Sequence, residues 1–167
     1  MSGADLVLHE EDFNRLMRIA DRVRRESNAR FIAVIDRNGQ PIAWTGEAPD
    51  IDRTAFASLA AGNVAATEAL ARMTGELAFS SMYHEGDRDH LHLSAVGDSG
   101  ILLVAFDERS SLGLVRLRVR QLTPDLAQVF VDMHAHSRAF NAGMDELAAA
   151  LPEISDEDIE SLFRDGL

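Results

Sequence analysis

The segment FIAVIDRNGQPIAWT, residues 31–45, decides the fold because it encodes two strands and the turn between them. Its first five residues are apolar, the DRNG stretch at 36–39 has the composition of a tight turn, and 41–45 is again suited to a strand. Asn38 and Gly39 are residue types that adopt the positive φ angles of a hairpin turn. The segment therefore predicts an antiparallel pair of strands.

Helices are predicted on both sides of this hairpin. Between residues 10 and 27, apolar side chains recur at spacings of three and four with arginines between them, which indicates an amphipathic helix. After the hairpin, Asp52 or Thr54 is suited to cap a long helix that runs to about Met73, where Thr74 and Gly75 end it.

The next part of the chain predicts the rest of a sheet. Strands are expected at 78–84, 89–96 and 100–106, with turn sequences between them. Together with the hairpin, these segments predict an α/β fold of the α+β type, with a five-stranded, mostly antiparallel sheet flanked by helices.

The C-terminal third is predicted to be helical but interrupted. A helix is expected from about Leu112 to Gln121, and Thr123-Pro124 has the pattern of an N-cap and first-turn proline that restarts or kinks it toward about His136. Residues 139–151 are expected to form a looser, partly helical spacer.

These predictions divide the chain into three parts. Residues 1–122 are expected to form the folded domain, 123–151 a helical extension and spacer, and 152–167 an acidic C-terminal peptide.

Charge and composition exclude several classes of protein. Sixteen basic residues, all arginine, stand against twenty-eight acidic ones, so the net charge of -12 argues against a nucleic-acid partner. The lack of lysine excludes a Walker-type phosphate loop, and the lack of cysteine excludes disulfides and thiolate metal sites. No apolar run approaches the roughly 20 residues that span a bilayer, and acids stand near the N-terminus where a signal peptide needs bases. We expect a cytoplasmic protein without a membrane partner.

No constellation of residues predicts an active site, a cofactor site or a metal site. His90 and His92 share a strand face, and with His84 nearby they could hold zinc, but histidines on a polar sheet face explain the pattern better. His134 and His136 point about 200° apart on a helix and cannot chelate one ion. We therefore expect no catalytic residue, no cofactor and no metal.

The long helix at about 52–73 carries two different sides. Its larger residues follow an approximate core stripe, and smaller or charged residues follow another side. The proposed core stripe is Phe56, Leu59, Asn63, Ala66, Leu70 and Met73, and the other side is Ala57, Ala61, Ala65, Glu68 and Arg72. A helix side made of such small residues is suited to a helix–helix contact in a dimer or to a flat platform for a different protein.

The predicted layers also favour a homodimer. Five strands about 4.8 Å apart make a sheet roughly 24 Å wide, whereas one helix covers only about 10 Å of it. The first and last helices can share one face, so the long helix leaves the other face partly bare. A second copy of the same helix is the expected cover.

Several stretches resemble the roadblock family and, within it, the bacterial polarity regulators. They are the hairpin at 31–40, the Ala-Ser-Leu-x-Ala-Gly-Asn helix at 57–66, and the segments 103–107 and 111–117. The similarity runs from about residue 6 to 122 and resumes at 153–163, whereas 124–152 departs most. The resemblance implies a roadblock/profilin-like fold for the domain at 1–122.

The same resemblance implies a function. The polarity regulators of the roadblock family are homodimers, and two copies bind one small Ras-like GTPase of the MglA type. They speed its GTP hydrolysis without donating an arginine finger, and they act in cell polarity or motility. The chain would then be a regulator of a partner enzyme and no enzyme itself. By correspondence, the GTPase-binding platform includes Ala61, Ala65, Glu68 and Arg72.

The acidic tail predicts a second partner-binding element. Ser155 is suited to cap a short helix, and Ile154, Ile159, Leu162 and Phe163 provide its apolar contacts. About nine residues are too few to hold a helix alone in water, so a flexible tail helix that folds on a partner is expected. The tail also resembles a flagellar peptide that grips a receiver domain, and docking on its own domain is a further alternative. A roadblock scaffold without catalytic effect is the other function that stays open.

Overall fold

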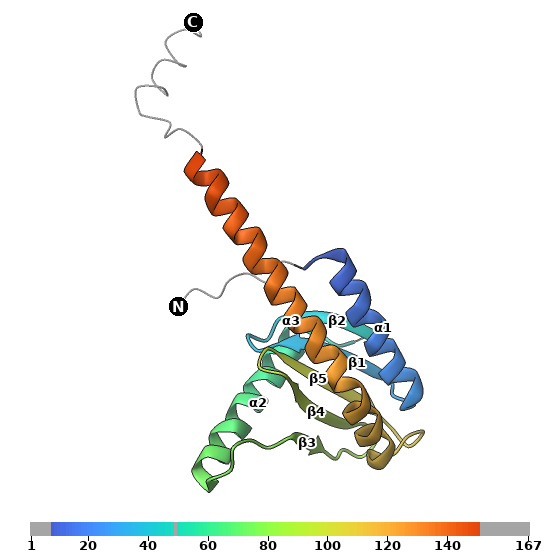
Figure 1. The fold of residues 1–167 in the computed structure, drawn as a ribbon. Coiled ribbons are helices and arrows are strands. Elements are labelled where there is room, and N and C mark those ends of the chain that lie inside the picture. The colour runs from blue at the N-terminus through green and yellow to red at the C-terminus, as the bar shows by residue number, and fades with distance from the viewer. Residues whose placement is uncertain (1–7, 49, 151–167) are drawn as a thin grey trace, which may run out of the picture.

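The computed structural model describes residues 8–48 and 50–150, which form a sheet with helices on both faces (Figure 1). The elements in chain order are α1 (Glu10–Glu26), β1 (Phe31–Asp36), β2 (Pro41–Gly46), α2 (Arg53–Thr74), β3 (Ser81–His84), β4 (His90–Val96), β5 (Gly100–Phe106) and α3 (Leu112–Ala150). The predicted strands are all present, and β3 begins three residues later than expected.

The five strands form one antiparallel sheet in the order β2-β1-β5-β4-β3. This arrangement confirms the predicted α+β class and its five-stranded sheet. Every residue of β5 is buried, as are the first five of β1, because these central strands are covered on both faces.

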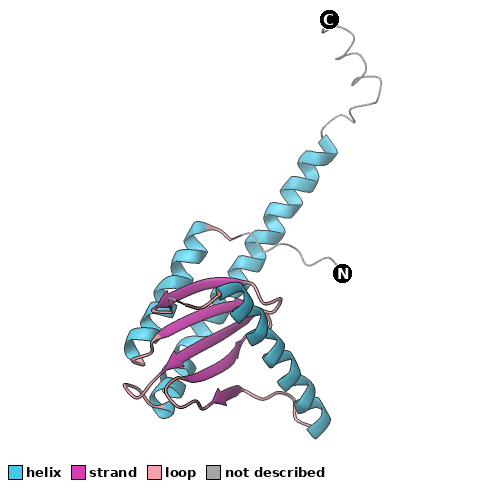
Figure 2. Ribbon diagram, turned by 180° about the vertical axis from the view of Figure 1, so that it is seen from behind, coloured by secondary structure: helices cyan, strands magenta, loops and turns pink. Residues whose placement is uncertain are grey.

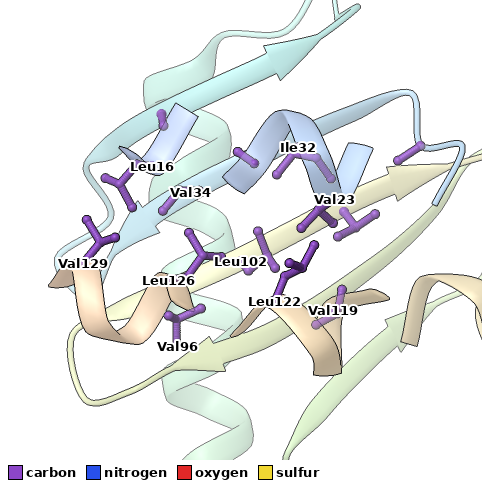
Figure 3. Close-up of a cluster of buried hydrophobic side chains, with 14 of the residues drawn as sticks. Leu16, Val23, Ile32, Val34, Val96, Leu102, Val119, Leu122, Leu126 and Val129 are labelled. Atoms are coloured by element: carbon purple, nitrogen blue, oxygen red, sulfur yellow. The ribbon is translucent and has the colours of Figure 1, made fainter. Parts of the chain in front are cut away.

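The helices divide between the two faces of the sheet. Helices α1 and α3 cover one face, where Leu16 and Val23 of α1 pack with Leu122 and Leu126 of α3 over the sheet (Figure 3). Helix α2 crosses the opposite face (Figure 2). This division confirms the prediction that the first and last helices share a face.

The turn between β1 and β2 differs from the predicted two-residue hairpin. Of its two expected positive φ angles, only that of Gly39 is present, at +86°. The carboxylate of Asp36 accepts hydrogen bonds from the backbone N–H groups of Asn38 and Gln40. These bonds stabilise a longer turn, and the pairing register shifts so that Ile35 lies opposite Pro41.

The predicted restart of the C-terminal helix at Thr123-Pro124 is wrong, because α3 continues through Pro124 to Ala150. Proline removes a backbone donor, and the carbonyl that loses this donor belongs to Arg120, an exposed residue. Buried residues on both sides of the proline, Leu122 and Leu126, hold the helix on the sheet. The looser spacer expected at 139–151 is regular helix as far as Ala150.

The second half of α3 extends beyond the body of the domain (Figure 1). Near the point of departure, Asp132 pairs with Arg15 at 2.6 Å, and the His136 ring nitrogen Nδ1 lies 2.7 Å from the buried Asp12 carboxylate. These contacts fix α3 against α1. The tail residues Ile154, Ile159, Leu162 and Phe163 lie outside the described residues, as does the whole predicted tail helix.

Replacement of Gly39 by alanine should destabilise the protein. A Cβ at this position would lie 2.8 Å from the Ser58 Cα of α2, and the left-handed backbone alone costs an L-residue about 1–2 kcal/mol. In urea unfolding, the free energy of unfolding of Gly39→Ala should be lower than that of the wild type by at least that amount. Gly113→Ala is the control, because no atom of the described residues lies within 4 Å of its added Cβ and alanine favours a helix. Equal stabilities of the two variants would contradict this role of Gly39.

Candidate partner-binding surface

Helix α2 has well-defined ends. The Asp52 carboxylate accepts hydrogen bonds from the backbone N–H groups of Thr54 and Ala55 at 3.0 and 3.1 Å, and Gly75 adopts the left-handed conformation at the C-terminus. Both caps agree with the sequence prediction. The helix therefore presents a fixed set of residues on each side.

The buried residues of α2 are all small. They are Ala57, Ala60, Ala61, Val64 and Ala71. The first four pack on the apolar face of β1, β4 and β5, which supplies the larger side chains of this second cluster. Small side chains allow the helix to lie close to the strands.

The predicted core stripe was therefore wrong for Leu59, Leu70 and Met73, whereas Phe56 does pack against the sheet-facing cluster, in edge contact with the Phe31 and Trp44 rings. Leu59 is 75% exposed, Leu70 56% and Met73 83%. They form an apolar line in solvent that we call the outer stripe, defined as Leu59, Asn63, Ala66, Leu70 and Met73. Periodicity identified the stripe correctly, but the core side of α2 is the side of the alanines.

A groove beside the outer stripe shows that α2 covers its sheet face incompletely. The groove has a volume of about 250 Å³ and lies between α2 and the strands β3 and β4. Leu59 lines one wall, and Leu91 and Leu93 line the other. Beyond the end of α2, Leu77 and Phe79 are also exposed. Exposed apolar surface that gathers in one region is typical of interaction sites.

The four predicted platform residues have different environments. Ala61 is only 9% exposed and packs on the sheet, so it offers a partner little surface. Glu68 is half-buried and forms an ion pair with Arg37 of the β1–β2 turn. Ala65 and Arg72 are exposed. The ion pair was missed at the sequence level because its partners lie 31 positions apart and no pattern between them links the two.

The exposed part of α2 has two flanks. At about 100° per residue, Leu70 lies about 20° from Leu59 around the helix, whereas Ala65 and Arg72 lie about 120° and 140° from Leu59. The outer stripe and the pair Ala65 and Arg72 can therefore contact two different molecules at the same time.

The histidines do not form a metal site in the described part of the chain, where no cluster of three candidate ligands occurs. His90 lies 3.2 Å from the Tyr83 hydroxyl, and His84 is exposed. His92 is 2% exposed, and burial, with a smaller contribution from Arg116, lowers its pKa to about 4. His92 is thus neutral at physiological pH.

The chain belongs to the Roadblock/LC7 domain family, which it matches over residues 17–106. Solved structures then identify it as a roadblock protein of the MglB type. It is similar to Myxococcus xanthus MglB, with 42% identity, a TM-score of 0.71, and coverage of 77% of this chain and 96% of that one. The resemblance to MglB-type roadblock proteins and to a roadblock fold is confirmed.

Two further structures agree. The gliding protein MglB from Thermus thermophilus is 34% identical, with a TM-score of 0.70 and coverage of 77% and 97% of the two chains. An MglB with a tetrameric arrangement is 32% identical, with a TM-score of 0.73 and coverage of 79% and 99%. The comparison with curated proteins finds no match. Within residues 8–48 and 50–150, no helix combines the length and the apolarity that crossing a bilayer requires.

Acidification should destabilise the protein through His92. Its folded-state pKa of about 4 lies below the ordinary 6.5, so between these values the unfolded chain binds a proton that the folded chain does not. The free energy of unfolding should therefore fall by about 3 kcal/mol from this residue alone as the pH falls from 6.5 to 4. Urea unfolding at a series of pH values should show a weaker decline for His92→Gln. An identical decline in the variant would contradict the assignment.

Proposed function

We propose that this chain is a homodimeric regulator that binds a small Ras-like GTPase of the MglA type and stimulates its GTP hydrolysis in cell polarity or motility control. The chain acts in the cytoplasm on a partner enzyme and performs no catalysis of its own. One observation carries the proposal: in an MglB-type roadblock protein, α2 leaves Leu59, Leu70 and Met73 in solvent. That surface needs a partner.

The outer stripe and the adjacent groove form the subunit contact in this proposal. Leu59 lines the groove, whose far wall contains Leu91, and Leu70 continues the same exposed stripe along α2. A second α2 that lies along the stripe buries apolar surface on both copies, as a two-fold symmetric interface requires. The tetrameric arrangement described for a similar MglB supports self-association as a property of such chains.

The other flank of α2 forms the GTPase contact. Ala65 and Arg72 are exposed there, and Glu68 is held by Arg37 at the edge of the same flank. Two α2 helices side by side present two such flanks, which fits one GTPase on two copies of this chain. Ala61 is buried against the sheet, so in this proposal it positions α2 and does not itself touch the GTPase.

Stimulation of hydrolysis without an arginine finger is consistent with the arginines in the loops. Arg109 is held by the Asp107 carboxylate through contacts of 2.9 and 3.0 Å, and this hydrogen bonding lowers the pKa of Asp107. Phosphoryl transfer depends on positioning and charge placement, and the GTPase can supply the charge itself. A regulator that binds the ordered state of the GTPase more tightly populates that state.

A scaffold without catalytic effect is the second candidate function. The projecting half of α3 favours it, because Phe140, Met144 and Leu147 are about half exposed and recur at spacings of four and three. Such a line on a protruding helix is suited to join partners in a GTPase or receiver-domain assembly. The effect on hydrolysis distinguishes the two candidates.

The purified chain should be a dimer. Light scattering at micromolar concentration should give about twice the chain mass of 18.3 kDa. The double variant Leu59→Glu with Leu70→Glu should give the mass of one chain and keep its helical circular dichroism, because both side chains are exposed within one copy. A wild-type chain of single mass would contradict the dimer.

Ala65→Arg should weaken GTPase binding at least a hundredfold, because an unpaired charge buried in a contact costs several kcal/mol. Ala65 is exposed, so the variant should keep its stability and its dimer mass. Ala135→Arg adds the same charge at an exposed position of α3 and is the matched control. Unchanged affinity of Ala65→Arg, measured by titration of the GTP-bound partner, would place the contact elsewhere.

No arginine of this chain should act as a finger. In single-turnover GTP hydrolysis, the wild type should accelerate the GTPase, and Arg88→Ala and Arg109→Ala should retain the acceleration within a few-fold. Loss of a true finger costs roughly 10³ to 10⁵ in rate. A thousandfold loss with unchanged binding would refute the mechanism, and tight binding by the wild type without acceleration would favour the scaffold.

A further inference from the structure

A second hollow lies on the face of the sheet opposite α2. It has a volume of about 530 Å³ and lies between α3 and the strands β3 and β4. The polar side chains that line it include His92 and Ser94 of β4, Ser81 of β3, and Arg116, Arg120 and Thr123 of α3. The partner-binding surface on α2 uses none of these residues.

Two buried polar side chains in this pocket lack a hydrogen-bond partner among the residues that the structure describes. His92 is 2% exposed and Ser94 is 6% exposed, yet both ring nitrogens of His92 and the hydroxyl of Ser94 are unsatisfied. Buried polar groups in folded proteins are nearly always hydrogen-bonded, so these groups have an unmet hydrogen-bonding capacity that a polar ligand in the pocket would satisfy. The hydroxyl and one imidazole N–H are available as donors.

The charge of the pocket indicates the sign of that ligand. Arg116 and Arg120 are four residues apart on α3 and so occupy the same side of the helix at the pocket rim. Neither makes an ion pair or a side-chain hydrogen bond within residues 8–48 and 50–150, whereas Arg15, Arg30 and Arg109 are all paired with aspartates. Two guanidinium groups without an acidic partner therefore make this rim positive in a chain with a net charge of -12.

We propose that this pocket binds a small molecule that carries a phosphate-type oxyanion, with Arg116 and Arg120 on the anionic oxygens and His92 and Ser94 as donors at the floor. Guanidinium groups bind such oxygens in a bidentate manner. The volume lies in the range of small-molecule sites and exceeds that of a bare anion, which favours a phosphate monoester. Val119 and Pro124 supply apolar wall for its organic part.

Calorimetric titration of the full chain tests the proposal with inorganic phosphate and adenosine monophosphate as probes, against sodium chloride at matched ionic strength. At least one probe should bind saturably, and the tighter of the two identifies the free or the esterified anion as the better ligand. The double variant Arg116→Ala with Arg120→Ala should lose at least tenfold in affinity. Arg138→Ala, at an exposed arginine on the same helix outside the pocket, should retain it. Absence of saturable binding, or equal affinity in the double variant, would overturn the proposal.

The His92 ring provides a second readout. The titratable and charged groups around it are Arg116 and Arg120 of α3, His90 of β4, and Tyr83, its register partner on β3. Sulfate keeps its double charge through this pH range, and an oxyanion beside the imidazole favours the protonated ring. Saturating sulfate should therefore raise the pKa of His92 from about 4 toward its ordinary value in histidine ring NMR spectra, with His92→Gln assigning the signal. A His92 pKa that sulfate leaves unchanged would refute the site. If His92→Gln fails to fold, the calorimetric titration of the arginine variants still tests the proposal, because Arg116 and Arg120 are exposed and their replacement should not affect folding.

Discussion

Alanine side chains on the inner side of α2 bring this helix close to the sheet. Ala57, Ala60 and Ala61 are short enough for close packing, and Val64 is the largest buried residue of the helix. The leucines of α2 have no room on that side, so they lie in solvent at the outer stripe. The contact that fixes the domain thus also creates the surface that needs a partner.

Much of the fold could be predicted because its signals are local. The DRNG turn, the Asp52 cap and the Gly75 end each depend on a few neighbouring residues, and the structure contains all three. The effect of Pro124 was predicted wrongly because it depends on tertiary packing: Leu122 and Leu126, on either side of the proline, are buried and hold the helix on the sheet. The two-residue turn at Asn38 and Gly39 was also predicted wrongly, because the Asp36 side chain stabilises a longer turn.

The surface was harder to predict because two sides of α2 are apolar. Helical periodicity separates Leu59 and Leu70 from Ala57 and Ala61, but it contains no information on which set faces the sheet. Of the predicted platform residues, Ala65 and Arg72 are exposed, whereas Ala61 is buried against the sheet and offers a partner little surface. The pocket around His92 could not be predicted, since its polar groups come together only when α3 packs on β4.

Thiol labelling tests the central claim that the two flanks of α2 have different partners. The chain contains no cysteine, so a single introduced thiol reports on one position. Leu70→Cys should react slowly in the free protein because the second copy covers it, whereas Ala65→Cys should react quickly and become protected only when the GTP-bound GTPase is added. Rapid labelling at position 70 in the free protein, or unchanged labelling at position 65 in the complex, would contradict the account.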